Sequence, residues 1–167
     1  MRTKCTVEKV VVSPFITTEK LPFEFLHRAN VLVWLTRTYK DGKKEKALLE
    51  IVLEPKYKTD GASTFWPISK WVPQWICGDD KYNAGPVGHD VLYMLGGIVT
   101  GEFEPVKLSR EEVDDILRGI WRCWGMSRFL AGCADKGVEL VAGGKKHWGS
   151  DNYGVRQFAT ATWTVLE

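Results

Sequence analysis

The chain has 167 residues, of which 44% are hydrophobic, and a formal net charge of +2. This length predicts one domain, residues 1–167, with enough apolar material for a core. The near-neutral charge and the lack of a run of Lys or Arg longer than two argue against nucleic-acid binding. No apolar run is long enough to span a membrane, and the N-terminal M-R-T-K-C-T-V-E-K is too polar for a signal peptide. We therefore expect a protein that is made as a soluble chain.

The four cysteines are far apart and form no C-x-x-C motif, which argues against a zinc ribbon. A secreted disulfide framework does not fit this length and spacing either, so we expect reduced, partly buried thiols.

The first part of the chain, about residues 1–65, predicts mainly β structure. Residues 31–39, V-L-V-W-L-T-R-T-Y, combine β-branched and aromatic side chains, and the K-D-G-K that follows is typical of a hairpin turn. A return strand is expected over about 47–53, and an earlier strand over about 7–12.

The second part, about residues 84–142, predicts mainly helix. Pro86 suits a first helical position, so a short helix is expected over 86–95, ended by Gly96-Gly97. Ser109 and Glu112 match the capping box of a second helix. Behind this box, apolar residues recur at helical spacing: Val113, Ile116, Leu117, Ile120, Trp121 and Trp124.

A third helix is expected from about 127 to 142, and the tail residues F-A-T-A-T-W-T-V are compatible with a final strand. The order of strands followed by helices predicts an α+β protein rather than a wound parallel sheet. We expect an N-terminal antiparallel β-sheet followed by a small bundle of about three helices.

His89 and Asp90 stand in an otherwise apolar helix, A-G-P-V-G-H-D-V-L-Y. At about 100° per residue, His89 and Tyr93 share one face, and Asp90 lies about a quarter turn away. A helix that is apolar nearly all round is buried, so both polar groups need partners.

The second helix offers such a partner. Asp114 falls at the edge of its apolar stripe, whereas Asp115 falls on the opposite side and is expected to be a surface charge. A carboxylate that accepts the ring N–H of a histidine orients the ring and raises its basicity, as in general-base catalysis. We therefore expect Asp114 to pair with His89.

The segment D-G-A-S, from Asp60 to Ser63, allows two interpretations. An Asp followed by small residues is typical of a tight turn after a strand, which is the favoured interpretation. The alternative makes Asp60 a ligand or orienting group that is brought to the helices.

Three ordered motifs, T-D-G-A-S (59–63), G-H-D-V-L-Y (88–93) and S-R-E-E-V-D-D-I-L (109–117), resemble an uncharacterised family of small proteins found in tailed-phage and prophage genomes. The match covers about residues 55–125, and Asp114 takes the family's acidic position. The resemblance implies a phage protein made in the host cytoplasm, whose partners are other phage or host proteins and which is incorporated in the virion if it is a structural component. It assigns no activity.

More distantly, H-D-x-x-Y with an Asp on a partner helix is similar to the catalytic core of calcium-dependent secreted phospholipases. The similarity implies His89 as general base, Asp114 as its orienting carboxylate, Tyr93 as a supporting hydroxyl and Asp90 as a calcium ligand. Calcium or another divalent metal needs several oxygen ligands, so Asp60 or the loop 77–85 would have to add to Asp90.

Two functions therefore stay open from the sequence. One is a structural or assembly component of the virion, or an accessory factor, in which the His-Asp-Asp cluster fixes the packing of the helices. The other is a small hydrolase that acts on a lipid or cell-envelope substrate.

Overall fold

A computed structural model describes residues 3–19, 22–59, 80–127, 148–150 and 154–166. Its elements in chain order are β1 (Lys4–Val12), β2 (Phe23–Glu24), β3 (Ala29–Thr38), β4 (Lys44–Leu53), β5 (Lys58–Thr59), α1 (Asp80–Met94), β6 (Ile98–Gly101), β7 (Val106–Lys107), α2 (Arg110–Cys123), α4 (Val155–Phe158) and β8 (Ala159–Leu166). The α+β class is confirmed. In the described part of the chain, no helix is long and apolar enough to cross a membrane.

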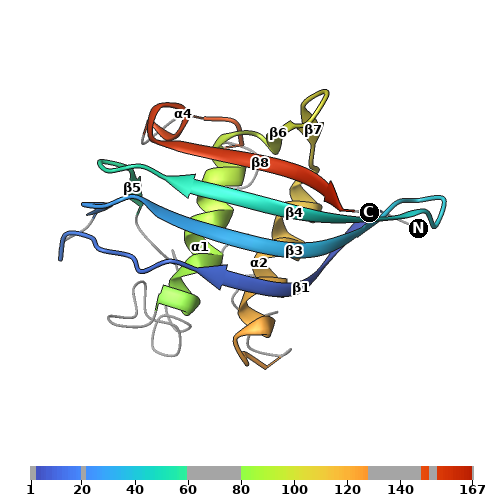
Figure 1. Cartoon of the computed structure of the whole chain (residues 1–167), viewed down its shortest axis with the longest axis horizontal. Helices are drawn as coiled ribbons and strands as arrows, with labels where there is room; N and C mark the ends of the chain where they lie inside the picture. Colours follow the sequence, from blue (N-terminus) through green and yellow to red (C-terminus); the bar gives the residue numbers. More distant parts are fainter. Residues whose placement is uncertain (1–2, 20–21, 60–79, 128–147, 151–153, 167) are drawn as a thin grey trace.

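The protein has two layers, with α1 and α2 side by side across one face of a twisted sheet (Figure 1). The sheet has six strands in the order β1-β3-β4-β8-β6-β7. All neighbouring strands are antiparallel except β6 and β8, which are parallel. A separate two-stranded sheet joins β2 to β5. The core lies between the main sheet and the two helices.

The predicted strands are confirmed, and their alternation explains which face is buried. In β3, Val31, Val33 and Leu35 are buried toward the helices, while the residues between them are partly exposed. The predicted D-G turn joins β3 to β4, and Gly42 has a φ of +88°, a conformation that glycine adopts without strain. Burial of each such aliphatic side chain stabilises the fold by about 1.5–3 kcal/mol.

The C-terminal tail forms the predicted strand and lies inside the sheet. β8 pairs with β4 along its whole length and with β6 on its other edge. The β6–β7 hairpin, which follows α1, was not predicted. The sheet is therefore completed by segments from the second half of the chain.

Helix α1 begins at Asp80, so the predicted start at Pro86 is wrong. Pro86 lies inside the helix, where it removes one backbone hydrogen bond. Tertiary packing explains the difference: Asn83 and Ala84 are buried, and a Cβ at Gly85 would lie 2.9 Å from Nε1 of Trp121 on α2. Close contact with α2 therefore outweighs the cost of the proline.

Helix α2 follows its sequence signals. The Ser109 hydroxyl accepts a hydrogen bond from the Glu112 amide, and the Glu112 carboxylate accepts one from the Ser109 amide, which completes the predicted capping box. The predicted apolar stripe is buried from Val113 to Trp121, whereas Trp124, the C-cap, is only partly buried. The helix ends before Gly125. The third predicted helix lies almost entirely outside the described residues.

Candidate functional site

The His89 cluster joins α1 to α2 and consists of His89, Asp90, Tyr93 and Asp114. Nε2 of His89 lies 3.0 Å from Oδ1 of Asp114. The His89 side chain is 5% exposed and that of Asp114 is 18% exposed. The structure thus brings together the two residues that the helical positions predicted to pair.

Asp90 lies on the other side of the ring. Its Oδ1 atom is 4.0 Å from Nδ1 of His89, and its Oδ2 atom accepts a hydrogen bond of 2.9 Å from the Thr59 hydroxyl. Thr59 ends β5 and directly precedes the D-G-A-S segment. The residue that precedes this segment is therefore hydrogen-bonded to α1. Asp60 and Ser63 themselves lie outside the described residues.

Tyr93 contacts His89 through the face of its ring. The two ring centroids are 5.3 Å apart with an interplanar angle of 29°, which is a stacked arrangement. Trp148 packs edge-on against Tyr93 at 5.0 Å, and the Arg110 guanidinium lies 5.5 Å from the Tyr93 centroid. The aromatic rings help to hold the imidazole in place.

The electrostatics of the cluster favour a charged histidine. Burial alone lowers the pKa of His89, but the hydrogen bonds and charges of Asp114 and Asp90 outweigh it and raise the pKa to about 9. A raised pKa favours the imidazolium at neutral pH, with Nε2 3.0 Å from Asp114 and Nδ1 facing Asp90 at 4.0 Å. In this state it cannot accept a proton, as a general base must.

Both carboxylates of the cluster are partly exposed, Asp90 at 21% and Asp114 at 18%. Asp114 lines a cavity of about 350 Å³ with Ser109, Arg110 and Trp148. His89 is not among the residues that line this cavity. The imidazole contacts the lining of this cavity at Asp114, whose Oδ1 atom is 3.0 Å from Nε2 of His89.

The predicted metal ligands were Asp90 and Asp60. Among the described residues, no group of three or more His, Cys, Asp and Glu side chains is arranged to hold a metal ion. Asp90 and Thr59 offer too few oxygen atoms for calcium, and the cationic His89 lies beside Asp90. A calcium site would depend on Asp60 or on the loop 77–85, and Asp60 and residues 77–79 lie outside the described residues.

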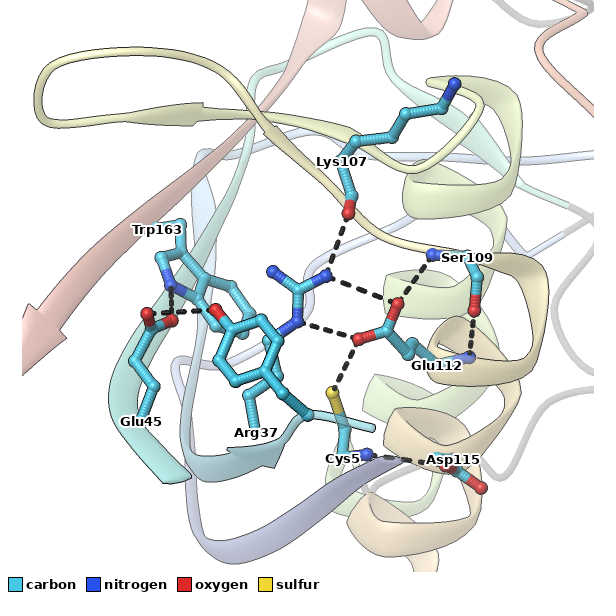
Figure 2. A network of polar contacts seen from close by, with 9 residues as sticks. Cys5, Arg37, Glu45, Lys107, Ser109, Glu112, Asp115 and Trp163 are labelled. Carbon is cyan, nitrogen blue, oxygen red and sulfur yellow. Dashed lines mark hydrogen bonds and ion pairs between the residues drawn. The ribbon is translucent and has the colours of Figure 1, made fainter. Parts of the chain in front are cut away.

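Sequence reasoning missed a second polar cluster, at the end of the sheet near the start of α2 (Figure 2). Arg37 on β3 and Glu112 on α2 form a two-pronged ion pair, with Nε–Oε1 at 2.7 Å and Nη2–Oε2 at 3.3 Å. Arg37 also donates to the Lys107 carbonyl at 2.9 Å, and the Cys5 thiol lies 3.9 Å from Glu112. Arg37 lies two residues after Leu35 in β3. Because alternate residues of a strand lie on the same face, this spacing indicates that Arg37 lies on the buried face.

Asp115 corrects a further prediction. It was expected on the solvated side of α2, but it is buried, accepts a hydrogen bond of 3.3 Å from the Cys5 amide and pairs with Arg118. The reason is that α2 contacts both α1 and β1, so that its buried arc is wider than one stripe. Asp114 faces α1 and Asp115 faces β1.

Comparison with known proteins gave no match: no protein-family model, no curated protein and no solved structure is significantly similar to the chain.

Proposed function

We propose that the protein is a non-enzymatic phage protein, either a structural or assembly component of the virion or an accessory factor. In this role the His89 cluster fixes the packing of the helices. The phage origin is supported by the three ordered motifs and their resemblance to the tailed-phage family. The protein would be made in the host cytoplasm, and its partners would be other phage or host proteins.

The observation that carries the non-enzymatic role is the position of the His89 ring between two carboxylates. Nε2 is 3.0 Å from Asp114, Nδ1 is 4.0 Å from Asp90, and the side chain is 5% exposed. A buried cation with an anion on each side stabilises one arrangement of the elements that carry them, because removal of the cation leaves two carboxylates without a compensating charge. Thr59 extends this connection from α1 to β5.

A second candidate is a small hydrolase, with His89 as base and Asp114 as the orienting carboxylate. The observation in its favour is that Asp114 lines a cavity of about 350 Å³ that would admit a small group. In such an enzyme His89 must lose its proton before it acts, so activity on lipid or peptidoglycan would increase as the pH approaches 9.

The deciding experiment compares the wild type with His89→Asn and with the control His27→Asn. His27 is an exposed histidine remote from the cluster in the sequence. The proposal expects His89→Asn to lower the melting temperature. It also expects that the wild type hydrolyses neither phospholipid nor peptidoglycan between pH 6 and pH 10. The protein should be found in purified particles or in a complex with phage or host proteins. Hydrolysis that disappears in a folded His89→Asn variant, and not in His27→Asn, would establish the hydrolase instead.

A further inference from the structure

One edge of β8 is covered only in part. β4 pairs with β8 as far as Leu166, but on the other edge the last pair with β6 is Gly101 with Trp163. Beyond Gly101 the chain enters the β6–β7 hairpin, which diverges from β8 (Figure 1). Within the described ranges no strand pairs with this edge of residues 164–166. An edge of this kind is a template for another strand.

A groove lies beside this open edge. Its volume is about 850 Å³, and its lining includes Tyr39, Trp163 and Val165 together with Phe103 at the tip of the hairpin. Phe103 is 93% exposed and Val165 is 52% exposed. Large apolar side chains exposed around a concave surface are typical of a protein-binding site.

The side chains on the floor of the groove are held in place by hydrogen bonds and an ion pair (Figure 2). Glu112 and the Lys107 carbonyl fix the Arg37 guanidinium. Glu45 accepts hydrogen bonds from the Tyr39 hydroxyl at 3.0 Å and from Nε1 of Trp163 at 3.1 Å. A preorganised floor reduces the entropy that binding would cost.

The charge of the groove indicates the charge of its binding partner. The ion pair with Glu112 compensates the charge of Arg37. The other charged residues of the lining are three carboxylates, Glu45, Glu102 and Glu104, and one ammonium, Lys107. This acidic excess favours a basic partner and opposes the pairing of two copies of this chain, because that would bring two acidic rims together.

We propose that this groove binds an extended, basic segment of a partner protein. The segment adds as a strand to residues 164–166 of β8 and places Lys or Arg side chains beside Glu102 and Glu104, while an apolar side chain packs against Phe103 and Val165. This inference goes beyond the proposed function, since it names a surface and the chemistry of the partner. It does not involve His89, so that the two proposals fail independently.

The test uses a short peptide of alternating lysine and valine as the probe and the ¹⁵N amide spectrum of the full chain as the readout. We expect shifts at residues 101–107 and 164–166, and binding that weakens as salt is added. The same peptide with glutamate in place of lysine should bind at least about tenfold more weakly. A lysine peptide with alternate backbone amides methylated should lose binding, because it cannot pair as a strand.

Matched variants separate this site from non-specific attraction. The double substitution Glu102→Lys with Glu104→Lys should weaken binding of the lysine peptide about tenfold, whereas Glu19→Lys, an exposed charge that does not line the groove, should not change it. Phe103→Ser should weaken binding, with Leu26→Ser, another exposed apolar residue, as its control.

Equal binding of the two peptides, no shifts at 164–166, or an unchanged affinity of the charge-reversed variant would overturn the proposal. A dimer in sedimentation that Phe103→Ser dissociates would also overturn it, because a second copy would then be the occupant.

Discussion

His89 on α1 and Asp114 on α2 are joined by a contact of 3.0 Å between Nε2 and Oδ1, at a place where both helices are otherwise packed through apolar side chains. Asp90 on the far side of the ring connects the same histidine to Thr59 of β5. One buried cation thus links three elements that are separate in the sequence. The contribution of this link to the free energy of unfolding can be measured without knowledge of the biological partner.

His89→Gln should lower the free energy of unfolding at pH 6 by about 3 kcal/mol, because it removes the cation and leaves Asp114 and Asp90 facing each other across a buried site. Urea unfolding of the wild type and the variant measures this difference. His27→Gln is the matched control and should stay within about 0.5 kcal/mol of the wild type, because His27 is exposed. A loss for His89→Gln no larger than that of the control would contradict the stabilising role.

The contribution of His89 should depend on pH. The pKa of His89 is about 9 in the folded protein and about 6.5 in the unfolded chain, so the folded state binds the proton more tightly. The stability that this proton supplies is therefore present in full below pH 6.5 and is lost as the pH rises through 9.

To isolate this effect, the free energy of unfolding of His89→Gln is subtracted from that of the wild type at each pH, which cancels groups that titrate alike in both proteins. We expect the difference to fall by about 3 kcal/mol between pH 6 and pH 10. A difference that stays constant over this range would show that His89 is not a buried imidazolium.

Two substitutions at Glu112 should separate the buried ion pair from the helix cap. Glu112→Gln keeps an acceptor for the Ser109 amide but removes the charge that faces Arg37, and should cost about 3 kcal/mol. Glu112→Ala removes both and should cost about 1 kcal/mol more. Urea unfolding of both variants, with Glu111→Gln as a control in the same helical turn, measures these values. Equal losses for Gln and Ala would mean that the hydrogen bond from the Ser109 amide to the Glu112 side chain contributes nothing.

The pairing of His89 with Asp114 could be predicted because each residue's position on its own helix is set by local periodicity. Asp115 could not be placed in the same way, because its burial depends on contact with β1. Its partner there, Cys5, is 110 positions away in the sequence. Arg37 and Glu112 are 75 positions apart, and the sequence around neither residue predicts that the two form a pair. Contacts between distant elements depend on the order of the strands and the placement of the helices. The sequence pattern predicted the α+β class but not this arrangement.

The strands followed from alternation and the hairpin from its D-G turn, because both signals are local. The start of α1 was misplaced because Pro86 is a strong local signal for a first helical turn, whereas the packing that extends the helix to Asp80 involves α2. The β6–β7 hairpin was missed since its strands, Ile98–Gly101 and Val106–Lys107, are too short to give a clear alternation.

The packing that places α1 can be tested directly at Gly85. A Cβ there would lie 2.9 Å from Nε1 of Trp121 and 3.1 Å from Cδ1 of Leu117, so Gly85→Ala should force α1 and α2 apart and cost about 1–3 kcal/mol. Gly88→Ala is the control in the same helix. Among the described residues its Cβ would meet only the flexible end of Ile51, at 3.2 Å, and the higher helix propensity of alanine offsets this contact. Thermal unfolding of both variants should therefore show a lower melting temperature for Gly85→Ala and little change for Gly88→Ala. The opposite order would mean that helix propensity, rather than contact with α2, determines the stability of this part of α1.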